Sequence, residues 1–196
     1  MSASRLLPAT LFMLAILLRS SAPVYAADTS AVRTIQVTVC DFIGVNPGML
    51  AAAEAVASAV YRTAAVTLEW THADCAGGPA GLHVNLVSTD SGDVHLAELA
   101  VGFAEPGGLT ATVLYNRLTR LAHHHHKKPQ IVLGYVMAHE LGHLLLPPHS
   151  HSATGIMRAT LNLDAGAGAL RVSFTPEQAE LIATKIGGMS ATVATH

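Results

Sequence analysis

Residues 137–146 read MAHELGHLLL, and the rest of the chain is organised around this stretch. It places His139 and His143 four residues apart, with Glu140 directly after the first histidine. Residues four apart on an α-helix lie one above the other, so both imidazoles can reach a single Zn²⁺ ion while Glu140 points toward a water on that ion. An ordinary buried helix can also carry these residues. The pattern therefore indicates a zinc site and needs support from the rest of the chain.

Prolines set the predicted ends of this helix. Pro129 suits a first helical turn, and an apolar run over residues 131–137 continues into the motif. Pro147 and Pro148 cannot continue a helix, and they disfavour the α region at the residue before them. The helix should end within a residue or two of Leu146.

The first 26 residues have the composition of a cleaved signal peptide. The chain of 196 residues is 51% hydrophobic and 12% charged, which suits one domain with a substantial core. Arg5 precedes an apolar stretch over 11–18 that is too short to span a bilayer, and small residues lead to Ala26. An uncleaved anchor is disfavoured because polar residues and a proline interrupt the apolar run. We expect a secreted or periplasmic domain over 27–196, with no membrane attachment.

The charge balance argues against nucleic acid as a partner. The formal net charge is −2, and loss of residues 1–26 removes two arginines and no acid, which brings it to −4. Aromatic residues make up only 5% of the chain and are not interleaved with a basic patch. The sequence leaves the oligomeric state open.

The chain contains two cysteines, Cys40 and Cys75. In an oxidising compartment two cysteines are expected to pair, so we predict a disulfide between them. The alternative is a thiolate that acts as an inhibitory zinc ligand. Nothing around either cysteine favours that alternative.

Residue patterns predict an α/β (α+β) domain. The segment 34–39 alternates polar and apolar residues as a half-buried strand does, and a turn at 46–48 precedes an alanine-rich helix over 49–62. A strand, a helix and a strand in this order favour a right-handed parallel crossover. Further strands are predicted over 66–70, 82–87 and 110–115, with a short edge strand over 99–104. A C-terminal helix should begin near Thr175, which has capping-box spacing to Gln178.

Four consecutive histidines, 123–126, invite a metal-binding interpretation. Four consecutive residues cannot all face one ion, so we interpret them, with the following Lys127, Lys128 and Pro129, as a solvated loop. Such tracts can still bind metal adventitiously.

A catalytic zinc ion takes three protein ligands and keeps one position open, so a third ligand must come from a segment that folds back on the helix. His149 and His151 lie ten and twelve residues beyond His139. A rival pattern would use a glutamate of the C-terminal helix, Glu177 or Glu180. Glu177 has a simpler explanation, because an acid in a first turn stabilises the helix N-terminus.

These features resemble the metzincin metalloproteases, most closely the matrixin branch. The resemblance rests on the 139–143 motif, on His149, and on Ile156-Met157 eight residues later. The predicted order of strands and helices is also similar to that of metzincin catalytic domains and of small exported bacterial metzincin-like proteins. The resemblance implies a twisted, mostly parallel sheet with one antiparallel edge strand, a backing helix, a zinc-site helix and a C-terminal helix. It also places Met157 in a turn beneath the metal, as a packing residue.

One departure from the matrixin pattern concerns the third ligand. The family has a glycine three residues after the second histidine, and Leu146 occupies that position here. Two prolines must make the turn instead. We therefore predict His149 as the third ligand on spacing, with His151 as the alternative.

The expected function is that of a zinc-dependent metalloendopeptidase acting on a peptide or protein substrate. Zinc lowers the pKa of a bound water and Glu140 serves as general base, so peptide hydrolysis needs no covalent intermediate. A substrate strand can add to the edge strand over 99–104. The alternatives are a zinc-binding protein without catalysis and a zinc amide hydrolase with a non-protein substrate.

Overall fold

A computed structural model of the chain describes residues 33–72, 81–88, 100–105, 107–161, 163 and 172–193. Its sheet has five strands in the order β2-β1-β3-β5-β4. The first four of these run parallel, and β4 pairs antiparallel with β5 at one edge. The strands are β1 (Arg33–Asp41), β2 (Val66–His72), β3 (Leu82–Val87), β4 (Gly102–Ala104) and β5 (Thr110–Leu114). The predicted mixed α/β fold with one antiparallel edge strand is therefore confirmed.

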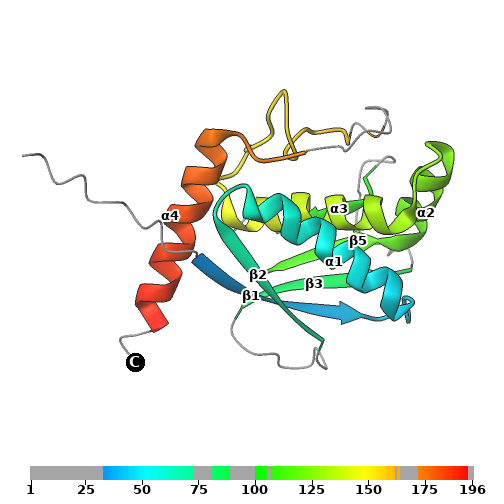
Figure 1. Cartoon of the computed structure of the whole chain (residues 1–196), viewed down its shortest axis with the longest axis horizontal. Coiled ribbons are helices and arrows are strands. Elements are labelled where there is room, and N and C mark those ends of the chain that lie inside the picture. Colours follow the sequence, from blue (N-terminus) through cyan, green and yellow to red (C-terminus); the bar gives the residue numbers. More distant parts are fainter. Residues whose placement is uncertain are drawn as a thin grey trace, which may run out of the picture.

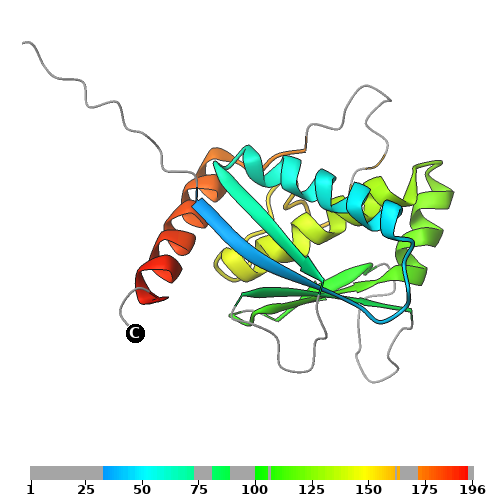
Figure 2. The same ribbon diagram turned by 60° about the horizontal axis from the view of Figure 1, so that its bottom comes forward.

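Two helices, α1 (Pro47–Arg62) and α3 (Pro129–Leu145), lie side by side over one face of the sheet (Figures 1 and 2). The sheet presents apolar residues to them at every second position, as in β3, where Leu82, Val84 and Leu86 are buried. Gly134 permits the close approach of the two helices, since a Cβ atom there would lie 2.4 Å from the Ala53 carbonyl oxygen. This packing fixes the position of α3, which carries the 139–143 motif.

The predicted ends of α3 are confirmed. Leu146 follows the last helical residue with an extended backbone, φ −98° and ψ 159°, as the proline after it requires. The helix is buried on almost all sides, including at His139 and Glu140. The Tyr61 hydroxyl, itself buried, donates a hydrogen bond of 3.3 Å to the carbonyl of Ala138 and ties α1 to this helix.

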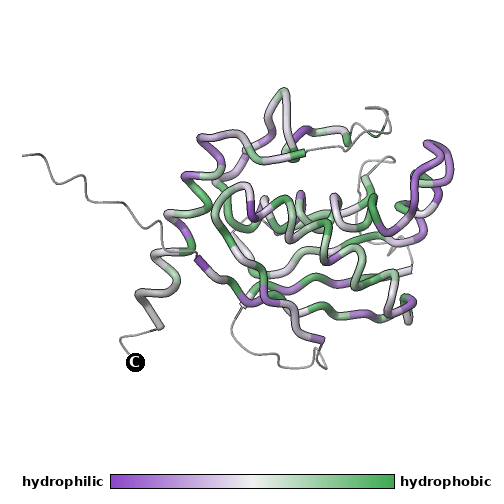
Figure 3. Tube along the Cα trace, in the orientation of Figure 1, coloured by the Kyte–Doolittle hydropathy of each residue, from purple (hydrophilic) through white to green (hydrophobic). Residues whose placement is uncertain are grey.

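The structure corrects the prediction for the histidine-rich segment. A helix, α2 (Tyr115–His124), follows β5 directly, so the first two histidines of 123–126 form its last turn and only the others lie in the loop. The sequence contains no capping side chain or glycine to mark the start of α2. Leu118 and Ala122 are buried one turn apart and hold the helix on the protein. The hydrophilic end of α2 stands out in Figure 3.

The last helix, α4 (Pro176–Val193), lies on the side of the molecule where β1 begins (Figure 1). Its predicted capping box is confirmed, because the Gln178 side chain accepts from the Thr175 amide at 3.1 Å and the Thr175 hydroxyl accepts from the Gln178 amide at 3.3 Å. No helix in the described part of the chain is long and apolar enough to cross a membrane.

Three sequence predictions involve residues outside the described ranges. The proposed signal peptide lies before residue 33, and the predicted edge strand over 99–104 is described only from residue 100 onward, with strand structure over β4. Cys40 is buried and is not a free thiol, but Cys75 is not among the described residues, so their pairing stays a prediction.

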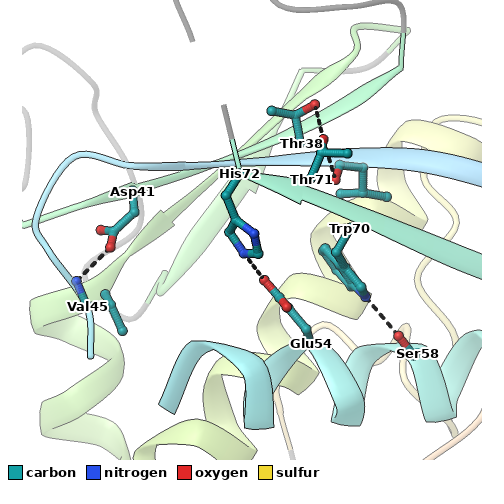
Figure 4. Close-up of polar contacts among 9 residues, drawn as sticks. Thr38, Asp41, Val45, Glu54, Ser58, Trp70, Thr71 and His72 are labelled. Carbon is teal, nitrogen blue, oxygen red and sulfur yellow. Dashed lines mark hydrogen bonds and ion pairs between the residues drawn. The ribbon is translucent and has the colours of Figure 1, made fainter. Parts of the chain in front are cut away.

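A group of polar side chains joins α1 to the other edge of the sheet (Figure 4). Nε2 of His72 lies 2.7 Å from a carboxylate oxygen of Glu54, and the indole of Trp70 donates to the Ser58 hydroxyl at 2.9 Å. The carboxylate of Asp41 accepts three backbone N–H groups of the turn after β1. The first two contacts give partners to the buried Glu54 carboxylate and to the Trp70 indole where β2 packs on α1, and the Asp41 bonds hold the turn between β1 and α1, so we assign the group a structural role.

Candidate metal centre

Three histidines converge at the C-terminal half of α3. His139 and His143 lie one turn apart on the helix, and His151 reaches them from the loop that follows. One ring nitrogen of each histidine lies within 4.8 Å of the others, and the Nε2 atoms of His139 and His143 are 3.1 Å apart. Nitrogens bound tetrahedrally to one zinc ion at about 2.0 to 2.1 Å are separated by roughly 3.3 Å. The three imidazoles can therefore hold one metal ion with small adjustments.

The backbone sets the tautomer of His139. Its Nδ1 lies 2.8 Å from the carbonyl oxygen of Ile156, which can only accept a hydrogen bond. The proton of the neutral ring therefore sits on Nδ1, and the lone pair of Nε2 faces His143. A carbonyl that orients the far nitrogen in this way is the usual support of a metal-binding histidine.

The two helical histidines favour their neutral forms. Burial lowers the pKa of His143 to about 4, with further contributions from His139 and His151. Burial also lowers the pKa of His139, although the hydrogen bond to Ile156 opposes the shift. Both rings are therefore unprotonated at neutral pH. A ring nitrogen must be unprotonated to bind a metal, so these histidines are ready to act as ligands.

Glu140 lies beside the histidines and is 6% exposed. Burial raises the pKa of its carboxyl group to about 8. The side chain packs against β4, because a Cβ atom at Gly102 would lie 2.8 Å from Oε1 of Glu140 and 3.0 Å from the Thr112 carbonyl oxygen. Gly102 therefore provides the space that the carboxylate occupies. The sequence analysis did not single out Gly102, because its partner lies 38 positions away along the chain.

The structure does not place His149 in the histidine group. Its ring is exposed and its backbone has φ +63°, in the left-handed region that residues other than glycine rarely adopt. The turn through Pro147 and Pro148 directs His149 away and brings in His151, two residues later. The geometry therefore favours His151, the alternative ligand, over the preferred His149. Glu177 and Glu180 are also outside the group of metal-binding side chains.

Met157 lies beneath the helix that carries the histidines. It is fully buried, and a Cβ atom at Gly142 would lie 2.5 Å from its sulfur atom. The thioether thus packs directly on the α3 backbone between the two ligand turns. The Phe174 ring lies against the same part of α3, since a Cβ atom at Gly142 would also lie 3.2 Å from it. Its centroid is 5.0 Å from the centroid of the Tyr61 ring. Met157 is therefore a packing residue on α3, and its place beneath a bound metal stays a prediction.

No protein-family model and no curated protein sequence matches the chain. Solved structures do share its fold. An archaemetzincin from Methanopyrus kandleri matches with a TM-score of 0.53 and 17% identity, over 83% of this chain and 99% of the other. A zinc-dependent peptidase from Methanocorpusculum labreanum matches with a TM-score of 0.53 and 16% identity, over 74% of this chain and 99% of the other. At these identities the likeness establishes the fold, and the activity must be argued from the site.

Proposed function

We propose that this protein is a zinc metalloendopeptidase in which His139, His143 and His151 hold the metal and Glu140 is the general base. The observation that carries the proposal is the convergence of three ring nitrogens within 4.8 Å beside a buried carboxyl group. Three imidazoles suit zinc and leave a coordination position open for water. The zinc-dependent peptidase among the structures of similar fold supports this choice of activity.

The chain's own residues would divide the chemistry between them. A bound zinc ion would lower the pKa of a water molecule and polarise the scissile carbonyl. Glu140 would take a proton from the attacking water and deliver it to the leaving amine. Its pKa of about 8 would fall beside a divalent cation, because an opposite charge favours the ionised form. The carboxylate would then be available as a base at neutral pH.

The edge strand offers a place for the substrate. In the described sheet β4 is the last strand, and it pairs with β5 on one side only. A substrate peptide can add there as a further strand, held by main-chain hydrogen bonds. Gly102, the first residue of β4, touches Glu140, so a peptide on this edge would run past the general base.

The first experiment measures zinc. We expect one tightly bound zinc ion per chain, and the double variant His139→Ala/His143→Ala should lose it. His151→Ala should weaken zinc binding more than His149→Ala, because only the His151 ring joins the group. Measured zinc dissociation constants in the reverse order would return the role of third ligand to His149. Full zinc retention by the double variant would refute the site.

The second experiment separates an enzyme from a zinc-binding protein. Glu140→Gln should keep zinc, since the three histidines remain, and should reduce cleavage of a mixed peptide library by about 10² to 10⁴-fold. Both proteins must be folded and zinc-loaded. Equal cleavage by the two would exclude Glu140 as the base. A zinc-loaded wild type that cleaves no peptide would favour a zinc protein without catalysis or an amide hydrolase with a non-protein substrate.

We further propose that the protein is exported after removal of residues 1–26. The supporting observations are the arrangement of the N-terminal sequence and the absence of a free thiol at Cys40. N-terminal sequencing of the exported protein should begin near Ala27. Intact mass before and after reduction should reveal the pairing of Cys40 with Cys75, and two alkylatable thiols in the unreduced protein would disprove it.

A further inference from the structure

The side chain of Gln178 links α4 to the segment that carries His151. Its Nε2 atom donates a hydrogen bond of 2.9 Å to the carbonyl oxygen of Ser150, 28 positions earlier in the chain. Gln178 is only 7% exposed although it lies in the first turn of a helix. An amide group is buried at little cost only when its donor and acceptor are both paired. Both are paired here, because Oε1 accepts from the Thr175 amide.

The backbone is anchored on both sides of His151. Before it, the Ser150 carbonyl accepts from Gln178. After it, the Ser152 amide donates to the Met157 carbonyl at 2.8 Å. His151 is an exposed residue whose ring contacts the other two histidines, at centroid distances of 5.5 Å from His139 and 4.8 Å from His143. Its position in the site therefore depends on the backbone that these two hydrogen bonds hold.

This dependence distinguishes His151 from the other two histidines. His139 and His143 stand on a buried helix whose own hydrogen bonds fix their backbone, and the Ile156 carbonyl further orients the His139 ring. A ligand on a loop must be ordered when the metal binds, and that ordering costs conformational entropy unless the loop is held beforehand. Gln178 supplies such a restraint at the residue directly before His151.

We propose that Gln178 is a positioning residue that orders His151 for metal binding. The inference rests on the proposed function only in taking His151 as the third ligand. Partners of metal ligands typically contribute about 10-fold to 100-fold in metal affinity. Since Gln178 acts one residue away from the ligand, we expect its loss to weaken zinc binding by about 10-fold, the lower end of that range.

Gln178→Glu isolates the contact with Ser150. The variant keeps a carboxylate oxygen that can accept from the Thr175 amide, and glutamate is a normal residue at this capping-box position. At a pH where the carboxyl group is ionised, it replaces the donating NH₂ group by an oxygen that cannot donate to the Ser150 carbonyl, so the hydrogen bond is lost. Thr175→Ala is the matched control. This variant removes the hydroxyl that accepts from the backbone N–H of Gln178, and it leaves the contact of the Gln178 side chain with Ser150 in place.

Ser150→Ala is a second control at the other partner. The Ser150 hydroxyl is buried and has no hydrogen-bond partner among the described residues. Its removal leaves the carbonyl that Gln178 binds. Zinc affinity should therefore be unchanged in this variant, which tests whether any change near His151 weakens the site.

The experiment measures zinc dissociation constants by competition with a chromophoric chelator, and the visible absorption spectrum of the cobalt-loaded protein. The thermal midpoint of each metal-free variant is measured alongside. Gln178→Glu should weaken zinc binding by about 10-fold and shift the cobalt spectrum toward that of His151→Ala. Thr175→Ala should lower the thermal midpoint yet keep wild-type affinity and spectrum.

Two outcomes would overturn the inference: wild-type affinity and spectrum for Gln178→Glu, or equal losses for Gln178→Glu and Thr175→Ala. If Gln178→Glu fails to fold, the zinc affinities of Gln178→Ala and Thr175→Ala are compared instead. A greater loss in Gln178→Ala supports the inference, and equal losses overturn it. Wild-type zinc binding by His151→Ala would instead show that the proposed ligand set is wrong. The failure of the proposed function is thus separable from the failure of this inference.

Discussion

Replacing Glu140 by glutamine should stabilise the metal-free protein while it strongly reduces hydrolysis. Burial raises the pKa of this carboxyl group from 4.5 to about 8. The unfolded chain therefore releases the proton near pH 4.5, whereas the folded protein keeps it until about pH 8. Between these values the folded state binds more protons than the unfolded state, so stability falls as the pH rises. Glutamine cannot ionise, so the variant does not lose this stability as the pH rises.

The window from pH 6.5 to 8 is where Glu140 dominates over the histidines. The pKa values of His139 and His143 are lowered from 6.5, so their rings are neutral in the folded state throughout this window and lose their remaining protons in the unfolded state just above pH 6.5, a contribution that the Glu140→Gln variant shares. One proton of difference is worth about 1.4 kcal/mol per pH unit. Because the folded carboxyl group itself begins to ionise as the pH approaches 8, Glu140 should lower the unfolding free energy of the wild type by about 1.5 kcal/mol across this window. Below pH 6.5 the histidines act in the opposite direction, because their depressed pKa values make acid destabilising.

The assay is urea denaturation in the presence of a chelator at several pH values from about 6.5 to 8, the window that the two sets of pKa values define. Wild type should show a falling free energy of unfolding, and Glu140→Gln should show a flatter profile that lies above it at the alkaline end. Glu180→Gln, an exposed change on α4, is the control and should follow the wild type. Parallel profiles for wild type and Glu140→Gln would refute the reasoning, because the buried carboxyl group would then not govern the pH dependence.

Three further substitutions test the packing around the site. Gly102→Ala would place a methyl group 2.8 Å from Oε1 of Glu140, so peptide cleavage should fall at least about 10-fold with zinc content unchanged, as steady-state rates and metal analysis would show. Gly142→Ala would force the buried sulfur of Met157 aside and should destabilise the protein by about 1 to 3 kcal/mol in urea denaturation. Tyr61→Phe removes a buried hydroxyl that donates to α3, so unfolding should cost about 1 kcal/mol less. Wild-type values in any of the three would contradict the corresponding contact.

The parts of the fold that depend on residues close together in the sequence could be predicted. The ends of α3 followed from prolines on either side, and the start of α4 followed from the spacing of Thr175 and Gln178. The helix α2 was missed because it continues directly from β5 without a turn residue or a capping side chain. Its stability comes from Leu118 and Ala122 packing onto the rest of the protein, which a local pattern does not reveal.

The pairing of His139 with His143, and the adjacency of Glu140, were determined by the sequence alone, because the helical repeat brings residues four apart onto one face. The third histidine was decided only by the tertiary structure. After Leu146 the helical repeat no longer applies, and the path of the loop depends on hydrogen bonds from residues that are distant in the chain. Gln178 donates a hydrogen bond to the Ser150 carbonyl, 28 positions earlier in the chain. The backbone on which this bond acts carries His151 to the site. Spacing within the motif carries no information about such contacts, since they arise only when α4 packs beside α3.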